Sequence, residues 1–224
     1  PAAVARLGEA NLCVPLVTAN FDVLYASHPT VEPLLDAMNR AEVRRLKLGY
    51  FKFDPETREY WEEVGRVRQA FADWQELAGR YGIRICYHTH SKRCMGLNGA
   101  ALAHLVRGFD PDRICAYVDT GHIVAEGAEF AMDLAMVRDH LAMVAVKDML
   151  IEREEKDGHG GRRHYCVKAG EGMVDWTSVF ASLSRAGYDG PVSMHCEFKL
   201  EEGEDFTEAV RREVVFFRRF VSRA

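Results

Sequence analysis

Apolar runs rich in β-branched residues alternate with amphipathic segments along almost all of this 224-residue chain. The amphipathic segments repeat apolar residues at helical spacing, and the connections between runs are long enough to join parallel strands. The runs predict strands at 12–17, 43–51, 83–88, 114–119, 141–148, 165–167 and 191–197. This alternation restricts the chain to the α/β class, as either a (β/α)8 TIM barrel or an open doubly wound sheet.

The barrel is the favoured architecture, because the glycine-rich first turn typical of the open sheet is absent. Residues 1–11 are predicted to be the end of a helix with no strand before them, so the barrel is expected to lack its first strand in this chain. No linker interrupts the sequence, which predicts a single, N-terminally incomplete barrel domain over residues 1–224. The charged, glycine-containing segment 151–163 is predicted to be a mobile surface loop.

Charge and cysteine content limit the classes of partner and compartment. Acidic residues outnumber basic ones by 34 to 29, for a formal net charge of −5, so no nucleic-acid partner is expected. The six cysteines lack CxxC spacing, which indicates free thiols in a reducing, cytoplasmic compartment. No apolar run is long enough to span a bilayer, so no membrane association is expected.

The run 114–119 ends in Asp119, and His122 follows three residues later. Carboxylate and imidazole groups are ligands that divalent metals take in proteins. Gly121 is expected to let the backbone turn between the two residues. Taken alone, however, an Asp at the end of a strand more often caps the following turn or helix.

Side-chain parity extends this observation to four predicted strands, because successive residues of a strand point to opposite faces. One class is apolar and suits the helix layer, as with Ala142, Val144 and Val146, whereas the other becomes polar toward the carboxyl end. Barrel enzymes place their chemistry at that end. The residues expected to line one pocket there are His88, His90, Asp119, Lys147, His195 and Glu197.

Each of these residues also has a purely structural interpretation. A lone histidine such as His88 is commonly a hydrogen-bonded structural residue, and Lys147 with Asp148 could form an ion pair at the strand end. Glu197 could merely neutralise Lys147. The convergence of all of these side chains on one rim favours a functional site over separate structural roles.

Five stretches of the sequence resemble motifs of the sugar phosphate isomerase/epimerase family, whose xylose isomerase-like TIM barrels also include apurinic endonucleases and inosose dehydratases. The stretches lie at 87–90, 118–127, 146–148, 170–176 and 187–193. The resemblance covers the chain from about residue 12 onward. It implies a TIM barrel that holds a divalent metal at its carboxyl rim, and Asp119 matches a ligand position of the family.

Three departures from the family pattern alter the expected ligand set. His88 stands where epimerases of the family carry a Glu, Ala145 replaces the usual His, and His195 replaces the usual Glu of the last strand. The pair of glutamates that shuttles protons in the epimerases is therefore not intact. The altered set predicts His88, Asp119 and His195 as ligands of manganese, zinc, iron or cobalt.

The expected function is that of a metal-dependent isomerase or epimerase that removes a proton next to the carbonyl of a sugar or keto-sugar. Glu197 is the expected base, His122 or His90 is the alternative base, and Lys147 is expected to stabilise the developing oxyanion. Dehydration begins with the same step, so a dehydratase of the same superfamily is an alternative. A non-catalytic barrel that binds carbohydrate or a protein partner is another. The expected partner is a small sugar or polyol, and a homo-oligomer is compatible with the sequence.

Overall fold

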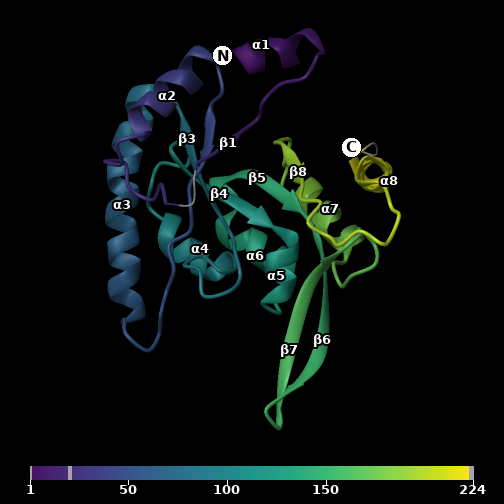
Figure 1. Ribbon diagram of the computed structural model, residues 1–224. Helices are drawn as coiled ribbons and strands as arrows, with labels where there is room; N and C mark the ends of the chain where they lie inside the picture. The colour runs from purple at the N-terminus through teal and green to yellow at the C-terminus, as the bar shows by residue number, and fades with distance from the viewer. Residues whose placement is uncertain (1, 20–21, 222–224) are drawn as a thin grey trace.

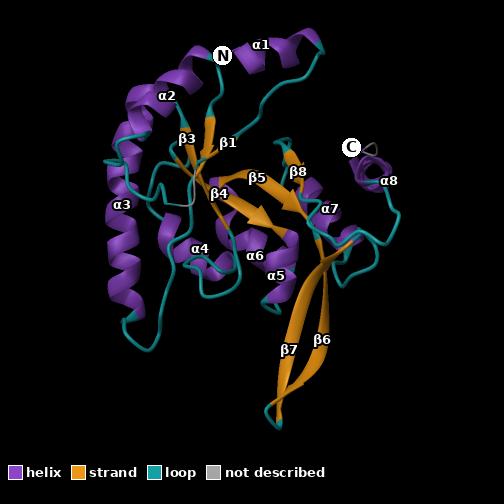
Figure 2. Cartoon of the chain, viewed as in Figure 1, coloured by secondary structure: helices purple, strands orange, loops and turns teal. Residues whose placement is uncertain are grey.

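The computed structural model describes residues 2–19 and 22–221, and its centre is one parallel sheet (Figures 1 and 2). Neighbouring strands pair in parallel in the order β1-β2-β3-β4-β5-β8. The strands are β1 (Val17–Thr18), β2 (Arg45–Lys47), β3 (Arg84–His88), β4 (Ile114–Asp119), β5 (Leu141–Val146) and β8 (Val192–Met194). Among the described residues this is an incomplete (β/α)8 TIM barrel, which confirms the predicted fold class.

Helices connect the strands and pack beside one another, α3 with α4, α4 with α6, α6 with α7 and α7 with α8. Their bounds are α1 (Ala2–Glu9), α2 (Val31–Arg40), α3 (Tyr60–Tyr81), α4 (Gly99–Val106), α5 (Thr120–Ala125), α6 (Phe130–Val137), η1 (Arg138–His140), α7 (Trp176–Arg185) and α8 (Phe206–Val221). Helix α1 buries none of its residues and lies apart from the sheet (Figure 1). No helix in the described part of the chain is both long and apolar enough to cross a membrane.

The first strand is shorter and later than the sequence predicts. The prediction placed it at 12–17, whereas β1 comprises only Val17–Thr18. Pro15 has no backbone N–H and cannot donate to a sheet ladder. The apolar run before β1 therefore contributes side chains, including Val14, to the core without joining the sheet.

Two apolar clusters lie on opposite faces of the sheet, as parity predicts. The outer cluster joins β4 residues such as Ile114 and Val118 to the helices, and the inner cluster contains Cys115, Tyr117 and Ala145. Ala142 departs from the prediction, because it packs in the inner cluster. The register of β4 and β5 shifts beside Tyr117, so an extra residue of β5 changes the parity there.

The segment 151–163 is not a loop, and this prediction is wrong. Strands β6 (Asp148–Lys156) and β7 (His159–Val167) form an antiparallel hairpin that projects from the body of the molecule (Figure 1). Asp157 and Gly158 have φ values of 53° and 77°, the left-handed backbone of a two-residue hairpin turn. The run predicted at 165–167 is the end of β7 and does not join the parallel sheet.

Candidate metal centre and active site

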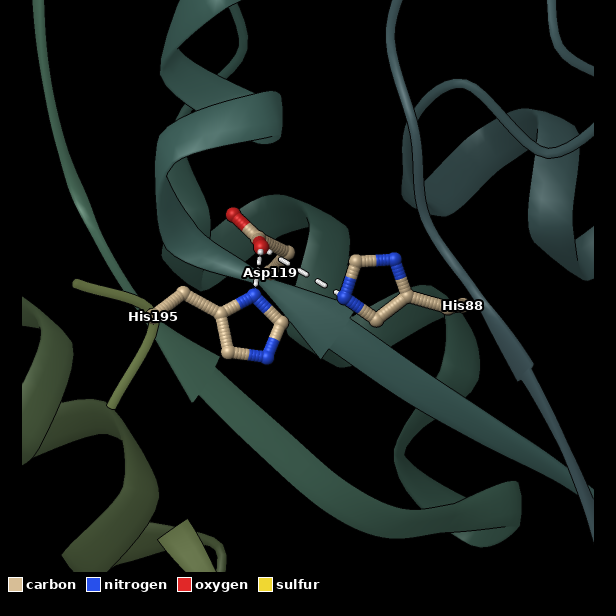
Figure 3. Close-up of side chains that lie close together, drawn as sticks. All are labelled: His88, Asp119 and His195. Carbon is tan, nitrogen blue, oxygen red and sulfur yellow. Dashed lines mark ion pairs between the residues drawn. The ribbon is translucent and has the colours of Figure 1, made fainter. Parts of the chain in front are cut away.

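Three potential metal ligands meet where β3, β4 and β8 end (Figure 3). Asp119 Oδ2 lies 3.4 Å from His88 Nε2 and 3.4 Å from His195 Nδ1. In Figure 3 both imidazole rings point a nitrogen at this carboxylate. One ligand atom from each residue lies within 4.8 Å of the other two, so the three could hold a single ion.

The ligand atoms of this cluster are better placed to bind a metal ion than to form hydrogen bonds with one another. His88 Nε2, Asp119 Oδ2 and His195 Nδ1 are buried, and none makes a well-oriented hydrogen bond among the described residues, although Asp119 Oδ2 also faces the Lys147 ammonium at 3.3 Å. Buried polar atoms are normally paired, so three ligand atoms that face one point are compatible with a bound cation. Two imidazoles and a carboxylate form a donor set that suits zinc, manganese, iron or cobalt.

Tyrosine hydroxyls lie against the other nitrogens of both imidazoles. The Tyr50 hydroxyl is 3.1 Å from His88 Nδ1, and the Tyr117 hydroxyl is 3.1 Å from His195 Nε2. Such contacts orient a ligating histidine and select its tautomer. Burial lowers the pKa of His88 to about 4, against the opposing effect of Asp119, which keeps this imidazole neutral as a ligand requires.

Asp119 serves as a helix cap and as a member of the cluster. Its Oδ1 accepts a hydrogen bond of 3.0 Å from His122 N at the start of α5, while Oδ2 faces the histidines. Burial raises the pKa of Asp119, but His195, His88 and Lys147 outweigh it and hold the pKa well below its usual range. The carboxylate is therefore charged and fixed in orientation.

Lys147 follows β5 and links the cluster to a second carboxylate. Its Nζ lies 3.3 Å from Asp119 Oδ2, 3.1 Å from Glu197 Oε2 and 3.0 Å from His122 Nε2. Burial lowers the pKa of Lys147, yet Asp119 and Glu197 outweigh it and raise the pKa overall. A buried ammonium thus stands between the two acids, and the Glu197 side chain is 57% exposed at the open edge of the site.

His122 and His90 occupy the side of the site nearest α5. Lys147 Nζ donates to His122 Nε2, which leaves His122 Nδ1 to donate to Ser91 Oγ at 2.9 Å. Burial lowers the pKa of His122 to about 2, so the ring is neutral. The His90 ring lies 4.1 Å from that of His122, and its Nδ1 is 2.8 Å from the Ser91 carbonyl oxygen.

Gly121 is needed for close packing and not for a turn. It lies within α5, and its φ is not among the positive values found at other glycines. A Cβ at Gly121 would lie 2.9 Å from the Lys147 carbonyl oxygen and 2.8 Å from Met149 Cγ. Glycine therefore lets α5 approach the end of β5, which brings His122 to the lysine.

Asp148 does not pair with Lys147, so that interpretation of the sequence is wrong. The buried carboxylate accepts five hydrogen bonds of 2.8–3.2 Å that hold the loop before α7 against β6. The donors are the amides of Met149, Gly170, Gly172 and Val174 and the indole of Trp176. The motif at 170–176 is thus explained by the packing of this carboxylate.

The structure brings all seven predicted site residues to one rim and adds residues that the prediction omitted. Tyr117 belongs to the inner parity class of β4, so parity could have identified it. Lys47 is the last residue of β2, whereas Tyr50 and Ser91 lie in the loops after β2 and β3, where no periodic pattern marks them. Lys47 is 6% exposed and its Nζ lies 4.2 Å from the centre of the Tyr50 ring.

Solved structures of sugar enzymes share this fold. A 3-keto-D-glucoside 4-epimerase from E. coli matches with a TM-score of 0.73 and 19% identity, over 96% of this chain and 82% of that chain. A D-tagatose 3-epimerase-like protein matches with a TM-score of 0.71 and 17% identity, over 99% and 81%. A probable 3-DHS dehydratase from Bacillus anthracis matches with a TM-score of 0.68 and 15% identity, over 96% and 80%.

Sequence relatives include several inosose dehydratases. That of Lacticaseibacillus casei is 24% identical over 162 residues, which are 69% of this chain and 53% of the relative. That of Geobacillus thermodenitrificans is 30% identical over 122 residues, 51% of this chain and 41% of the relative. The chain thus spans about half the length of the curated relatives it matches.

The family model for xylose isomerase-like TIM barrels matches residues 26–219, which include every residue of the site described above. The parallel sheet and the solved structures that resemble it agree with this match. The chain therefore belongs to the xylose isomerase-like TIM barrel family.

Proposed function

We propose that this chain carries the active site of a divalent-metal-dependent enzyme that removes a proton next to the carbonyl of a sugar or keto-polyol. The observation that carries the proposal is the convergence of three buried ligand atoms, one each on His88, Asp119 and His195, within 4.8 Å of one another. The similarity to sugar epimerases and inosose dehydratases supports the substrate class.

The ion, when bound by His88, Asp119 and His195, would polarise the substrate carbonyl as a Lewis acid. Glu197 is the proposed base, because it is a carboxylate at the open edge of the site with an exposed side chain. Lys147 holds Glu197 Oε2 at 3.1 Å, and its fixed positive charge stabilises the oxyanion that forms when the proton leaves. His122 lies behind Lys147 and positions the ammonium.

Dehydration is the second candidate, and the single carboxylate favours it over epimerisation. Epimerisation removes a proton from one face of a carbon and returns one to the other face, which suits two bases. Among the described residues, Glu197 is the one carboxylate outside the ligand cluster that contacts both Lys147 and His195. Elimination of water needs one base and one acid, roles that Glu197 and Lys147 can share.

Proton exchange tests the proposal directly. Metal-loaded protein is incubated in D2O with 2-keto-myo-inositol or D-fructose, and NMR follows loss of the signal of the proton next to the carbonyl. We expect exchange with at least one of them, and loss of that exchange by about 100-fold or more in Glu197→Gln, as expected for removal of a general base. Glu201→Gln is the matched control, because the Glu201 carboxylate is 85% exposed and pairs with Lys168.

The products separate the candidates. Loss of the mass of water from the substrate identifies a dehydratase, whereas exchange with retained mass identifies an isomerase or epimerase. Metal and sugar binding without exchange would contradict the proposal and support a barrel that only binds carbohydrate.

A further inference from the structure

Lys47 is a second buried lysine on the inner side of the sheet. It ends β2 and pairs in register with Cys86 of β3, which belongs to the inner cluster with Tyr117. Residues paired in register on parallel strands point to the same face. The Lys47 side chain therefore lies on the same side of the sheet as the candidate metal centre.

The Lys47 ammonium is connected to that centre through Tyr50. Its Nζ lies 4.2 Å from the centre of the Tyr50 ring, and the hydroxyl of this ring is 3.1 Å from His88 Nδ1. Burial lowers the pKa of Lys47 to about 8, although Cys94, Glu197 and Asp119 raise it. Lys47 is thus within electrostatic reach of both acids and carries its charge at neutral pH.

The exposed fraction of Lys47 is similar to that of the other residues of the site. It is 6% exposed, equal to His122 and more exposed than Lys147 at 3% or His88 at 1%. The burial of Lys47 therefore does not exclude its contact with a ligand that reaches those side chains. A lysine is rarely buried this far without a role for its charge, because desolvation of an ammonium is costly.

The charge balance of the site indicates what Lys47 binds. The two lysines balance the carboxylates of Asp119 and Glu197, and metal-bound histidines are neutral. A divalent ion then leaves two net positive charges. A substrate carboxylate would neutralise one of them and leave the other to stabilise the oxyanion, whereas a phosphate dianion would neutralise both.

We propose that Lys47 binds a carboxylate of the substrate, which makes an acidic keto-sugar or keto-polyol the substrate class of this site. This inference rests on the proposed function. Lys47 acts in recognition of the substrate, while Glu197 and Lys147 act at the reacting carbon.

Binding of a matched series tests this assignment without requiring turnover. D-fructose, D-fructuronate and D-fructose 6-phosphate differ only at the sixth carbon, and calorimetry measures their dissociation constants with zinc-loaded protein. We expect D-fructuronate to bind about tenfold or more tightly than D-fructose, as a charge-assisted contact provides. Lys47→Met should abolish the difference and leave D-fructose binding unchanged.

Two further variants keep the test interpretable. Lys47→Arg retains the charge and should retain the preference, which separates loss of charge from loss of fold. Lys52→Met removes an exposed lysine from the same segment and should also retain the preference for D-fructuronate. A preference that survives in Lys47→Met, equal loss of D-fructose and D-fructuronate binding, or tightest binding of D-fructose 6-phosphate would overturn the assignment. Because binding is measured, absence of proton exchange would count only against the proposed function.

Discussion

Replacement of Asp148 by Asn is predicted to destabilise the protein strongly, although the two side chains have nearly the same size and shape. Asp148 is 1% exposed, and its carboxylate accepts five hydrogen bonds. Oδ1 accepts from the amides of Met149 and Val174, and Oδ2 accepts from the three other donors. The NH2 group of an Asn would face N–H donors at whichever position it takes, so at least two hydrogen bonds are lost.

A hydrogen bond to a charged group contributes about 1.5–3 kcal/mol, so we expect Asp148→Asn to lower the free energy of unfolding by about 3–6 kcal/mol. That is a large part of the total of about 5–15 kcal/mol typical of a protein domain. Urea unfolding followed by tryptophan fluorescence measures the change, since the Trp176 indole is one of the donors.

Asp175→Asn is the matched control, because it removes the same charge from the same loop. Asp175 caps α7 by accepting a single hydrogen bond from Ser178 N, and Asn caps helices equally well. We therefore expect a change below about 0.5 kcal/mol for the control. A loss below about 1 kcal/mol for Asp148→Asn, the value of one neutral hydrogen bond, would refute this explanation of the loop.

Three other predictions concern packing, pH and the metal. Gly99→Ala should lower the free energy of unfolding by about 2–3 kcal/mol, because the new Cβ would lie 2.5 Å from Asp133 Cα. Gly65→Ala places its Cβ in open space and should raise the free energy of unfolding by about 0.5–1 kcal/mol. Thermal unfolding measures both changes. Glu63→Gln should destabilise the protein at neutral pH, because the hydrogen bond from Arg66 lowers the pKa of Glu63 and stabilises the charged carboxylate in the folded state. The stabilisation by Glu63 is lost as the pH falls through its lowered pKa. The difference in unfolding free energy between wild type and Glu63→Gln should therefore shrink in acid. Tyr117→Phe should weaken metal binding by about 10–100-fold in a competitive chelator titration, and an unchanged affinity would show that the hydroxyl does not orient His195.

The fold could be predicted because its signal is repeated along the chain. Alternation of strands and helices together with parity identified the parallel sheet and its inner face. The prediction failed where local chemistry competes with periodicity. The hairpin was missed because charged residues and glycines occupy the halves of its strands next to the turn, although Asp157-Gly158 is a strong turn signal.

The sequence predicted the candidate site less completely than it predicted the fold. Parity brought His88, Asp119 and His195 to one rim because each lies at a strand end, and their metal binding stays a prediction. Parity failed at Ala142, because a register shift in β5 cannot be read from alternation alone. Contacts such as that of Tyr50 with His88 depend on the path of a loop, which no periodic pattern encodes.

Metal content shows whether His88, Asp119 and His195 hold one divalent ion. The protein is incubated separately with manganese, zinc, iron and cobalt, desalted and subjected to elemental analysis beside Asp119→Ala and His104→Ala. His104 is a control on the outer helix α4, where its ring contacts Tyr60. We predict near-stoichiometric metal in the wild-type protein and in His104→Ala, and none in Asp119→Ala. No bound metal in the wild-type protein with any of the four ions, or equal metal in Asp119→Ala, would contradict a metal site at these three residues.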